Sequence, residues 1–491
     1  MPSNFPTQTL LAAATFAAIL LAVHYGLDRT KGLDPTSTIR PITQFPTDRT
    51  SYVPVAKVPI PPVSPTLAIP DPNARGRSPK DAANSTLQSE FLIDDNGVLD
   101  HFYAALENLS TGPNKRDVRI VHYGDSPTTA DLITGDAREL LQQRFGNAGP
   151  GFILIAKPWA WYGHHGVDVS ADGWKIDTAV GSMREANYGL GGAIFTGSVG
   201  ATSTIHLSAH DSTAIEVEYL AEPNGGNLQV IADGTPAGTV QTAADTKQNA
   251  ATSIPLPPGT KKVELRVSGS PVQLFGVAFS RDNLGLTYDS IGLNGASTTV
   301  MSRAFNPTTF AASLQHRNPD LVVINYGTNE SGFPSYVEKL YEPELIRAIG
   351  RVRAALPNAS ILIMSPMDRG ERSGDQISTM RAIPEIVTIQ QRVAQQTGCG
   401  FFNTYQAMGG SGTMARWYDR HPAMVGADLI HPSPQGARIV AQLLTGQLLI
   451  GYERYMQNHQ PPQNKPSTPV ADAIPTQAAT QTSIVKPTGV Q

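Results

Sequence analysis

The stretch IVHYGDSPTTADLITGD, Ile120–Asp136, bears on both the fold and the chemistry of this chain. Its apolar beginning is typical of a buried strand, and the spacing of apolar residues from about 129 onward is typical of a helix. Gly124, Asp125 and Ser126 stand between the two patterns. A serine presented where a strand gives way to a helix is either part of a plain turn or a nucleophile held in place. The rest of the sequence decides between these two interpretations.

Four further short apolar runs alternate with helical patterns along the chain. The predicted strands are 118–124, 286–292, 320–327, 360–366 and 400–403, and the predicted helices lie near 95–109, 129–145, 336–355, 378–396 and 434–454. Short apolar strands separated by helices are typical of a parallel sheet that is covered on both faces. The sequence therefore predicts an α/β fold, a flavodoxin-like three-layer α/β/α domain with a five-stranded parallel sheet.

Residues 169–281 have a different pattern. Short runs with alternating apolar and polar residues are separated by the turn signals NGG, DGT and PPGT, with no helical period of useful length. We therefore expect an inserted all-β sandwich domain here, which splits the α/β domain into residues 91–168 and 282–456.

The two ends of the chain do not have the composition of globular domains. Thr9–Val23 carries no charge, so residues 1–26 are predicted to be a signal peptide or a membrane anchor. We prefer an uncleaved anchor, because no Lys or Arg precedes Arg29 and no small-residue cleavage site follows Val23; its orientation stays open. Residues 27–90 read as a proline-rich linker, and 457–491 read as a disordered tail that lacks aromatic residues.

Composition excludes several classes of function. The chain has 491 residues, a formal net charge of −4 and no long run of Lys or Arg, so no nucleic-acid partner is expected. A single cysteine, Cys399, excludes an internal disulfide and a thiolate zinc cluster. The adjacent pair His164 and His165 has no evident third ligand, so neither a metal nor a cofactor is expected.

The predicted strand ends and the loop before the last helix carry the residue types that acyl transfer needs. Because sites in parallel sheets form at the carboxyl ends of strands, we expect these residues to meet. Ser126 is the candidate nucleophile, His431 its base, and Asp428 the carboxylate that orients the imidazole. The backbone N–H groups of Ser126 and Gly295 and the side-chain amide of Asn329 are candidate donors to an oxyanion.

His421 is a rival for the base, since it too is followed by proline. Asp419 precedes it by only two residues, and no clear helix follows. His431 has Asp428 three residues before it, then Ser433 and Pro434 as a helix cap and first turn, so we prefer His431.

These segments resemble the four motif blocks of the SGNH (GDSL) hydrolase superfamily. GDS at Ser126 is similar to the nucleophile block, GLNGA at Gly295 to the glycine block, GTNE at Asn329 to the asparagine block, and DLIHP at Asp428 and His431 to the Asp-x-x-His block. Pro127 departs from the family, which usually has a residue with an N–H there, but proline is compatible with the start of a helix. The resemblance implies a serine hydrolase that acts on carboxylic esters.

A looser resemblance concerns the stretch GPGFILIAKPWAWYGHHG together with the inserted β domain. These are similar to bacterial cell-envelope carbohydrate esterases, including peptidoglycan O-acetylesterases. The resemblance implies a monomer in the cell envelope, on the periplasmic or extracellular side, held to the membrane by the N-terminal segment. It would remove short acyl groups, acetyl above all, from an acylated carbohydrate.

Two other functions stay open from the sequence. One is a polysaccharide O-acetyltransferase that uses the same acyl-enzyme, and the other is a non-catalytic glycan-binding protein. A lipase is disfavoured, because no long apolar lid segment accompanies the motifs.

Overall fold

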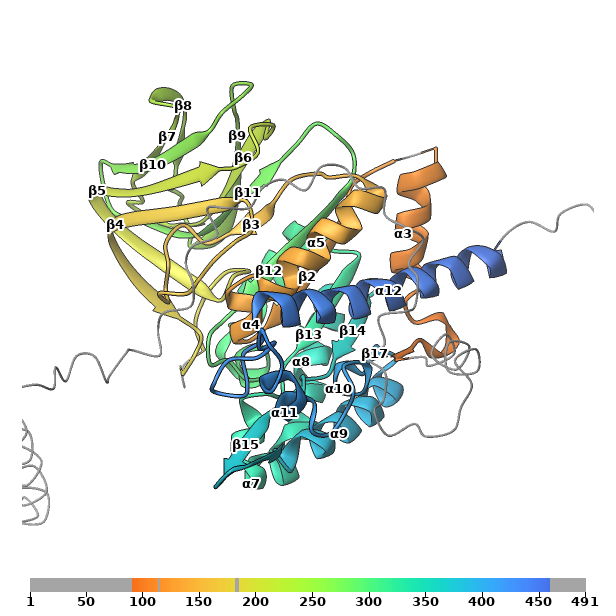
Figure 1. The fold of residues 1–491 in the computed structure, drawn as a ribbon. Helices are drawn as coiled ribbons and strands as arrows, with labels where there is room; N and C mark the ends of the chain where they lie inside the picture. The colour runs from red at the N-terminus through yellow and green to blue at the C-terminus, as the bar shows by residue number, and fades with distance from the viewer. Residues whose placement is uncertain (1–90, 114, 182–184, 460–491) are drawn as a thin grey trace, which may run out of the picture.

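The computed structural model describes residues 91–113, 115–181 and 185–459, which form an α/β part and an all-β part (Figure 1). The predicted anchor at 1–26 and the predicted linker at 27–90 lie outside the described residues, as do residues 460–491 of the predicted tail. The first three residues of the tail predicted at 457–491 are helical instead, because the last helix continues to His459. Within the described residues, no helix is both long and apolar enough to cross a bilayer.

The α/β part is built on one six-stranded sheet. Its strand order is β1-β17-β14-β13-β2-β12. The strands are β1 (Leu92–Ile93), β2 (Val118–Gly124), β12 (Leu286–Gly292), β13 (Leu321–Asn325), β14 (Ser360–Met364) and β17 (Gly400–Phe402). Neighbouring strands from β12 to β17 pair in parallel, whereas β1 pairs antiparallel with β17.

The α/β class is thus confirmed, but the predicted five-stranded, all-parallel sheet is wrong by one strand. The sheet is mixed, because Leu92 and Ile93 add a short antiparallel edge opposite Phe402 and Phe401. Two residues are too few to show a period in the sequence, so this strand has no signal of its own.

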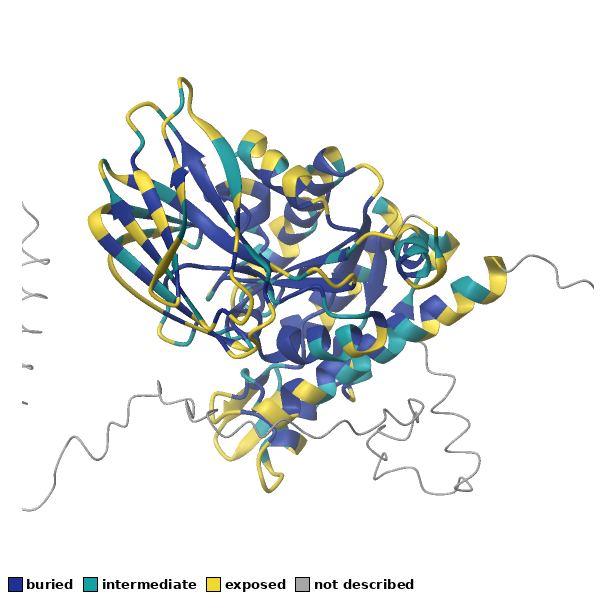
Figure 2. Ribbon diagram, turned by 90° about the horizontal axis from the view of Figure 1, so that it is seen from above, coloured by how far each residue is buried: buried dark blue, intermediate teal, exposed yellow. Residues whose placement is uncertain are grey.

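Helices cover both faces of the sheet. One face carries α3 (Asp100–Thr111), α5 (Leu132–Phe145) and α12 (Pro434–His459), and the other carries α6 (Pro307–Arg317), α8 (Glu342–Ala355) and α9 (Ala382–Thr397). Alternate residues of β13 supply the two cores: Leu321 packs with the first set and Val322 with the second. The central strands are accordingly buried on both faces (Figure 2).

Shorter elements complete the α/β part. They are η2 (Asp95–Gly97), α4 (Ser126–Thr129), η3 (Val300–Ala304), η4 (Glu330–Gly332), α7 (Pro334–Tyr336), η5 (Val337–Tyr341), the hairpin β15 (Gly370–Ser373) and β16 (Gln376–Thr379), α10 (Thr404–Ala407) and α11 (Thr413–Tyr418).

The insert is an antiparallel, all-β structure. Its strands are β3 (Gly151–Ile153), β4 (Val167–Thr178), β5 (Ala193–Leu207), β6 (Ala214–Ala221), β7 (Asn227–Ala232), β8 (Thr235–Gln241), β9 (Gln248–Pro255), β10 (Lys262–Ser268) and β11 (Val272–Ser280). Two of them, β3 and β4, begin before residue 169, where the sequence predicted the insert to start.

The nine strands form one continuous sheet, so the expected pair of separate sheets in a sandwich is wrong. The long strand β5 connects what would otherwise be two sheets, since its first half pairs with β11 and its second half with β10. The sheet curls over a single core, and its terminal strands β8 and β9 come into contact. Along β10, Val263, Leu265 and Val267 point inward and are buried.

Candidate active site

Three neighbouring strands bring the candidate residues to one edge of the central sheet. Gly124 at the end of β2 lies in register with Gly292 at the end of β12 and with Asn325 at the end of β13. Ser126 therefore follows the end of β2 by two residues, between the loops that leave β12 and β13. This is the edge that the sequence predicted.

The strand β2 turns into the helix α4 at Ser126. Gly124 allows this tight turn, because a Cβ at that position would lie 2.2 Å from Thr128 Oγ1. Ser126 is the first residue of α4 and Pro127 the second, so the proline begins a helix as expected. The serine is 8% exposed, and its Oγ lies 2.7 Å from His431 Nε2.

Asp428 holds the other side of the imidazole. Its Oδ2 lies 2.6 Å from His431 Nδ1, and its Oδ1 accepts hydrogen bonds from the backbone N–H groups of Ile430 (3.0 Å) and His431 (3.1 Å). Burial acts to raise the pKa of the Asp428 carboxyl, but these hydrogen bonds outweigh it and hold the pKa at about 2. The carboxylate is therefore ionised at neutral pH and favours the Nδ1–H tautomer of His431, in which Nε2 faces the serine hydroxyl as a proton acceptor.

An unusual backbone conformation lets Asp428 and His431 approach each other. Leu429 between them has a φ of +59°, a region that residues other than glycine seldom adopt. Its side chain is buried, and its carbonyl accepts a hydrogen bond from the N–H of Gly370 (2.9 Å). Packing and this contact with β15 hold the loop in the conformation that builds the Ser-His-Asp arrangement.

The glycine and asparagine segments lie side by side at the place expected for an oxyanion hole. Asn329 Nδ2 donates to the carbonyl of Ala296 (2.8 Å), so its amide is oriented and its second N–H is available. Gly295, with a φ of +74°, is in the left-handed region that favours glycine. Among the described residues, the N–H groups of Ser126 and Gly295 have no backbone acceptor, which leaves them available to an oxyanion.

Glu330 has a role that spacing in the sequence did not indicate. It is buried, and its Oε1 accepts from the N–H and the hydroxyl of Thr298 (both 2.8 Å), while Oε2 accepts from the N–H of Gly327 (3.1 Å). Burial outweighs these bonds and raises the pKa of Glu330. The carboxyl ties the loop of Gly295 to the loop of Asn329, so we regard Glu330 as a positioning residue for the oxyanion hole.

A second buried acid, Asp125, directly precedes the nucleophile in the chain. Burial raises the pKa of the Asp125 carboxyl to about 7; a hydrogen bond from Thr328 opposes this shift and the nearby Glu330 reinforces it. Asp125 and Glu330 are thus two buried carboxyl groups close enough to interact, and the carboxylate bonded to the imidazole is that of Asp428.

The other candidate histidines lie elsewhere. His421 is exposed, and the hydrogen bond from Ser126 goes to His431 instead. His122 is buried within β2 and its Nδ1 bonds the hydroxyl of Tyr288 (2.7 Å). His165 donates its backbone N–H to Asp131 (2.7 Å), which anchors the loop that contains the pair His164 and His165.

We expect Asn329→Ala to lower kcat for a small ester by roughly 10²–10³-fold, because one oxyanion donor is lost, while KM changes little. Steady-state kinetics on p-nitrophenyl acetate measure both constants. Asn358→Ala, at an exposed position, is the control and should behave like the wild type. A loss below tenfold in Asn329→Ala would remove Asn329 from the oxyanion hole.

Part of the chain matches a known family. Residues 267–439 match the family model described as the GDSL-like lipase/acylhydrolase family. That range holds Gly295, Asn329, Asp428 and His431, while Ser126 lies before it, because the insert separates the nucleophile from the other segments. A comparison with curated protein sequences gives no match.

A comparison with solved structures gives several similar proteins. A peptidoglycan O-acetylesterase is similar with a TM-score of 0.64 and 24% identity, over 74% of this chain and 99% of that one. A salicylyl-acyltransferase from a tetracycline biosynthetic pathway has a TM-score of 0.27 and 14% identity, over 58% and 98%. An acetylxylan esterase from Geobacillus stearothermophilus has a TM-score of 0.26 and 19% identity, over 34% and 73%.

The fold and the family model together define the class of protein. It is a serine hydrolase that acts on carboxylic ester bonds. More narrowly, residues 267–439 match the GDSL-like lipase/acylhydrolase family, the family that the four motif segments resemble.

Proposed function

We propose that this esterase removes short acyl groups, acetyl in particular, from a polysaccharide of the cell envelope. The reaction passes through an acyl-enzyme on Ser126. The low exposure of the nucleophile Ser126, 8%, supports a short acyl chain. The main observation that supports a carbohydrate substrate is a trough in the surface beside the loop that contains Gly295.

In the proposed reaction, His431 Nε2 takes the proton of Ser126 as Oγ attacks the ester carbonyl. The tetrahedral oxyanion accepts hydrogen bonds from the N–H groups of Ser126 and Gly295 and from Asn329 Nδ2. When the intermediate collapses, the C–O bond to the sugar breaks and the imidazolium gives its proton to the leaving oxygen. Water then attacks the acyl-enzyme with His431 as its base, and the acid and the free serine result.

The trough has a volume of about 420 Å³ and is formed largely by the insert. It is lined by Pro158, Trp159, Ile176, Asp177, Thr178, Val180 and Gly181. An indole face beside a carboxylate and a hydroxyl is a combination that suits a sugar ring, since the apolar face of the ring stacks on the indole and its hydroxyls bond to the polar groups.

Two contacts join the trough to the site. Trp161, in the same loop as Trp159, donates its indole N–H to Asn294 Oδ1 (3.2 Å), directly before Gly295. Val180 of the trough lies 3.8 Å from the position that a Cβ on Gly295 would occupy. A sugar in the trough would therefore lie next to the proposed oxyanion hole.

The loop that carries Trp159 is held against the nucleophile helix. The carbonyl of Trp159 accepts from the N–H of Tyr162 (2.9 Å), and the N–H of Gly163 donates to the carbonyl of Thr129 in α4 (3.2 Å). Tyr162 Oη accepts from the N–H of Leu154 (2.8 Å). The backbone of the loop is thus held against α4, which favours a defined distance between the sugar and the scissile ester.

Two further points support hydrolysis in the envelope. The side chains of His431 and Asp428 are 26% and 33% exposed, so water reaches the base, whereas transfer to a sugar hydroxyl needs a drier site. The neighbour with the same fold is a peptidoglycan O-acetylesterase, and by analogy we propose that this protein acts on a similar polymer. The uncharged N-terminal segment, outside the described residues, would tether it to the membrane.

Trp159→Ala tests the trough. We expect KM for acetylated oligosaccharides to rise roughly tenfold, the equivalent of about 1.4 kcal/mol, while kinetics on p-nitrophenyl acetate stay unchanged. Acetate release from O-acetylated peptidoglycan, xylan and alginate identifies the polymer, and p-nitrophenyl esters of increasing length report the acyl chain. Val199→Ala, at an exposed position of β5 on the insert, is the control. Equal losses on polymer and small ester would instead assign Trp159 a structural role.

A further inference from the structure

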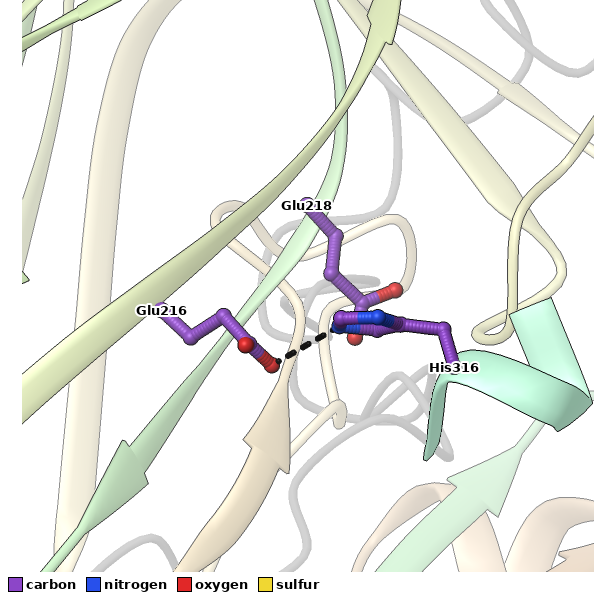
Figure 3. Close-up of side chains that lie close together, drawn as sticks. All are labelled: Glu216, Glu218 and His316. Atoms are coloured by element: carbon purple, nitrogen blue, oxygen red, sulfur yellow. Dashed lines mark ion pairs between the residues drawn. The ribbon is translucent and has the colours of Figure 1, made fainter. Parts of the chain in front are cut away.

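A cluster of three side chains joins the insert to the α/β part at a place remote from the motif segments. Glu216 and Glu218 lie on β6 of the insert, and His316 lies in the last turn of α6. Figure 3 shows the two carboxylates directed toward the imidazole from the opposite element. Residues two apart on a strand point to the same face, which is why both glutamates reach the same histidine.

The donor atoms have a spacing that a metal ion can use. Glu216 Oε1 lies 3.2 Å from His316 Nε2, and one ligand atom from each of the three residues lies within 4.8 Å of the others. Tetrahedral Zn²⁺ with bonds of about 2.0–2.2 Å to nitrogen and oxygen needs donors roughly 3.3 Å apart. The pair Glu216 and His316 already has this spacing, so only the Glu218 carboxylate has to move closer.

Glu218 has a buried carboxylate oxygen to which a ligand could bind. It is 4% exposed, and its Oε1 is fully buried without a hydrogen-bond partner among the described residues. A buried carboxylate without a donor is costly, so an unaccounted proton, water or cation is expected beside it.

The nearby guanidinium groups are engaged elsewhere. Arg317 makes two hydrogen bonds to Asp289, of 2.5 Å and 2.7 Å. Arg119 donates to the backbone carbonyl of Arg317 (3.0 Å). No described arginine or lysine forms an ion pair with Glu218. The side chain of His316 is 44% exposed, so solvent reaches the cluster from that side.

We infer that Glu216, Glu218 and His316 form a binding site for a divalent transition metal, with Zn²⁺ as the best match, that joins the insert to the α/β part. An imidazole nitrogen with two carboxylate oxygens is a donor set of zinc sites, and water would complete the tetrahedron at the exposed side of His316. Ca²⁺ and Mg²⁺ are disfavoured, because they prefer more ligands and only oxygen. This inference does not depend on the proposed substrate.

The test uses the full chain after treatment with a chelator. Isothermal titration with Zn²⁺ should give one site, and saturating Zn²⁺ should raise the melting temperature by about 3 °C or more. Co²⁺ in place of Zn²⁺ should give the visible absorption of a tetrahedral site. Glu218→Gln and His316→Gln should abolish these three signals, while His206→Asn, which removes an exposed histidine of the same insert, should keep them.

Two other results would contradict the inferred metal site. Zinc binding that persists in both Glu218→Gln and His316→Gln would place the ion elsewhere, for example at His431. Folded wild-type protein that does not bind Zn²⁺ or Co²⁺ would show that the Glu218 carboxyl is buried in its protonated form. Esterase activity on p-nitrophenyl acetate confirms that each variant is folded, because the cluster contacts none of the motif segments.

Discussion

Replacing Ser126 by alanine is expected to lower kcat/KM for p-nitrophenyl acetate by roughly 10⁴- to 10⁶-fold, close to the background rate. The Ser126 hydroxyl lies in hydrogen-bond contact with His431 Nε2, at 2.7 Å, and without this nucleophile no acyl-enzyme forms. The alanine removes one oxygen at a site that is already tightly packed, so the fold should persist. Steady-state kinetics and the thermal unfolding transition measure the two effects separately.

Ser170→Ala, on an exposed position of β4, is the matched control and should retain full activity. Should Ser126→Ala keep activity within tenfold of the wild type, Gly124-Asp125-Ser126 would be a plain turn and the nucleophile would lie elsewhere.

The second large effect concerns His431. His431→Ala should lower kcat/KM nearly as much as Ser126→Ala, because the serine is a weak nucleophile without a base. The two residues act as one unit, so the double variant should be no slower than Ser126→Ala alone. The ratio of kcat/KM values across the four proteins gives this comparison directly.

His421→Ala provides the control for the histidine, since His421 is exposed and followed by proline as His431 is. It should keep nearly full activity. Losses that multiply in the double variant would mean that Ser126 and His431 act independently, and a large loss in His421→Ala would reopen the choice of the base.

The strands of the sheet were predictable where apolar runs end at a glycine. β2 and β12 begin and end as predicted, at Val118–Gly124 and Leu286–Gly292. The predicted helix at 129–145 is interrupted, since α4 ends at Thr129 and α5 begins at Leu132. Between them Asp131 has a φ of +51° and its carboxylate bonds Arg138 and the N–H of His165, tertiary contacts that a helical period does not reveal.

Other elements had no local signal at all. The hairpin β15–β16 was not predicted, because its four-residue strands are mostly exposed and show no apolar alternation; its last two residues fall within the helix predicted from 378, which begins only at Ala382. The curling of the insert into one sheet depends on β5 changing partners from β11 to β10, and register between strands far apart in the chain is not visible in either strand alone.

The site was predictable because parallel strands end at one edge, so the motif segments had to converge. Spacing identified Ser126, Gly295, Asn329, Asp428 and His431, and the structure brings them to that edge. Spacing in the sequence could not identify the role of Glu330, because its carboxylate accepts hydrogen bonds from backbone groups on two separate loops. Nor could it identify the cluster of Glu216, Glu218 and His316, since a strand and a helix about 100 residues apart supply its ligands.

The central claim is that Ser126 is the residue that becomes acylated, and covalent labelling tests it most directly. A fluorophosphonate, which reacts with activated serines, is incubated with the wild type, and the modified peptide is located by mass spectrometry. We expect one label, on Ser126, with no label in Ser126→Ala and much slower labelling in His431→Ala. A label on another serine, or equal labelling of Ser126→Ala, would contradict the assignment of the active site.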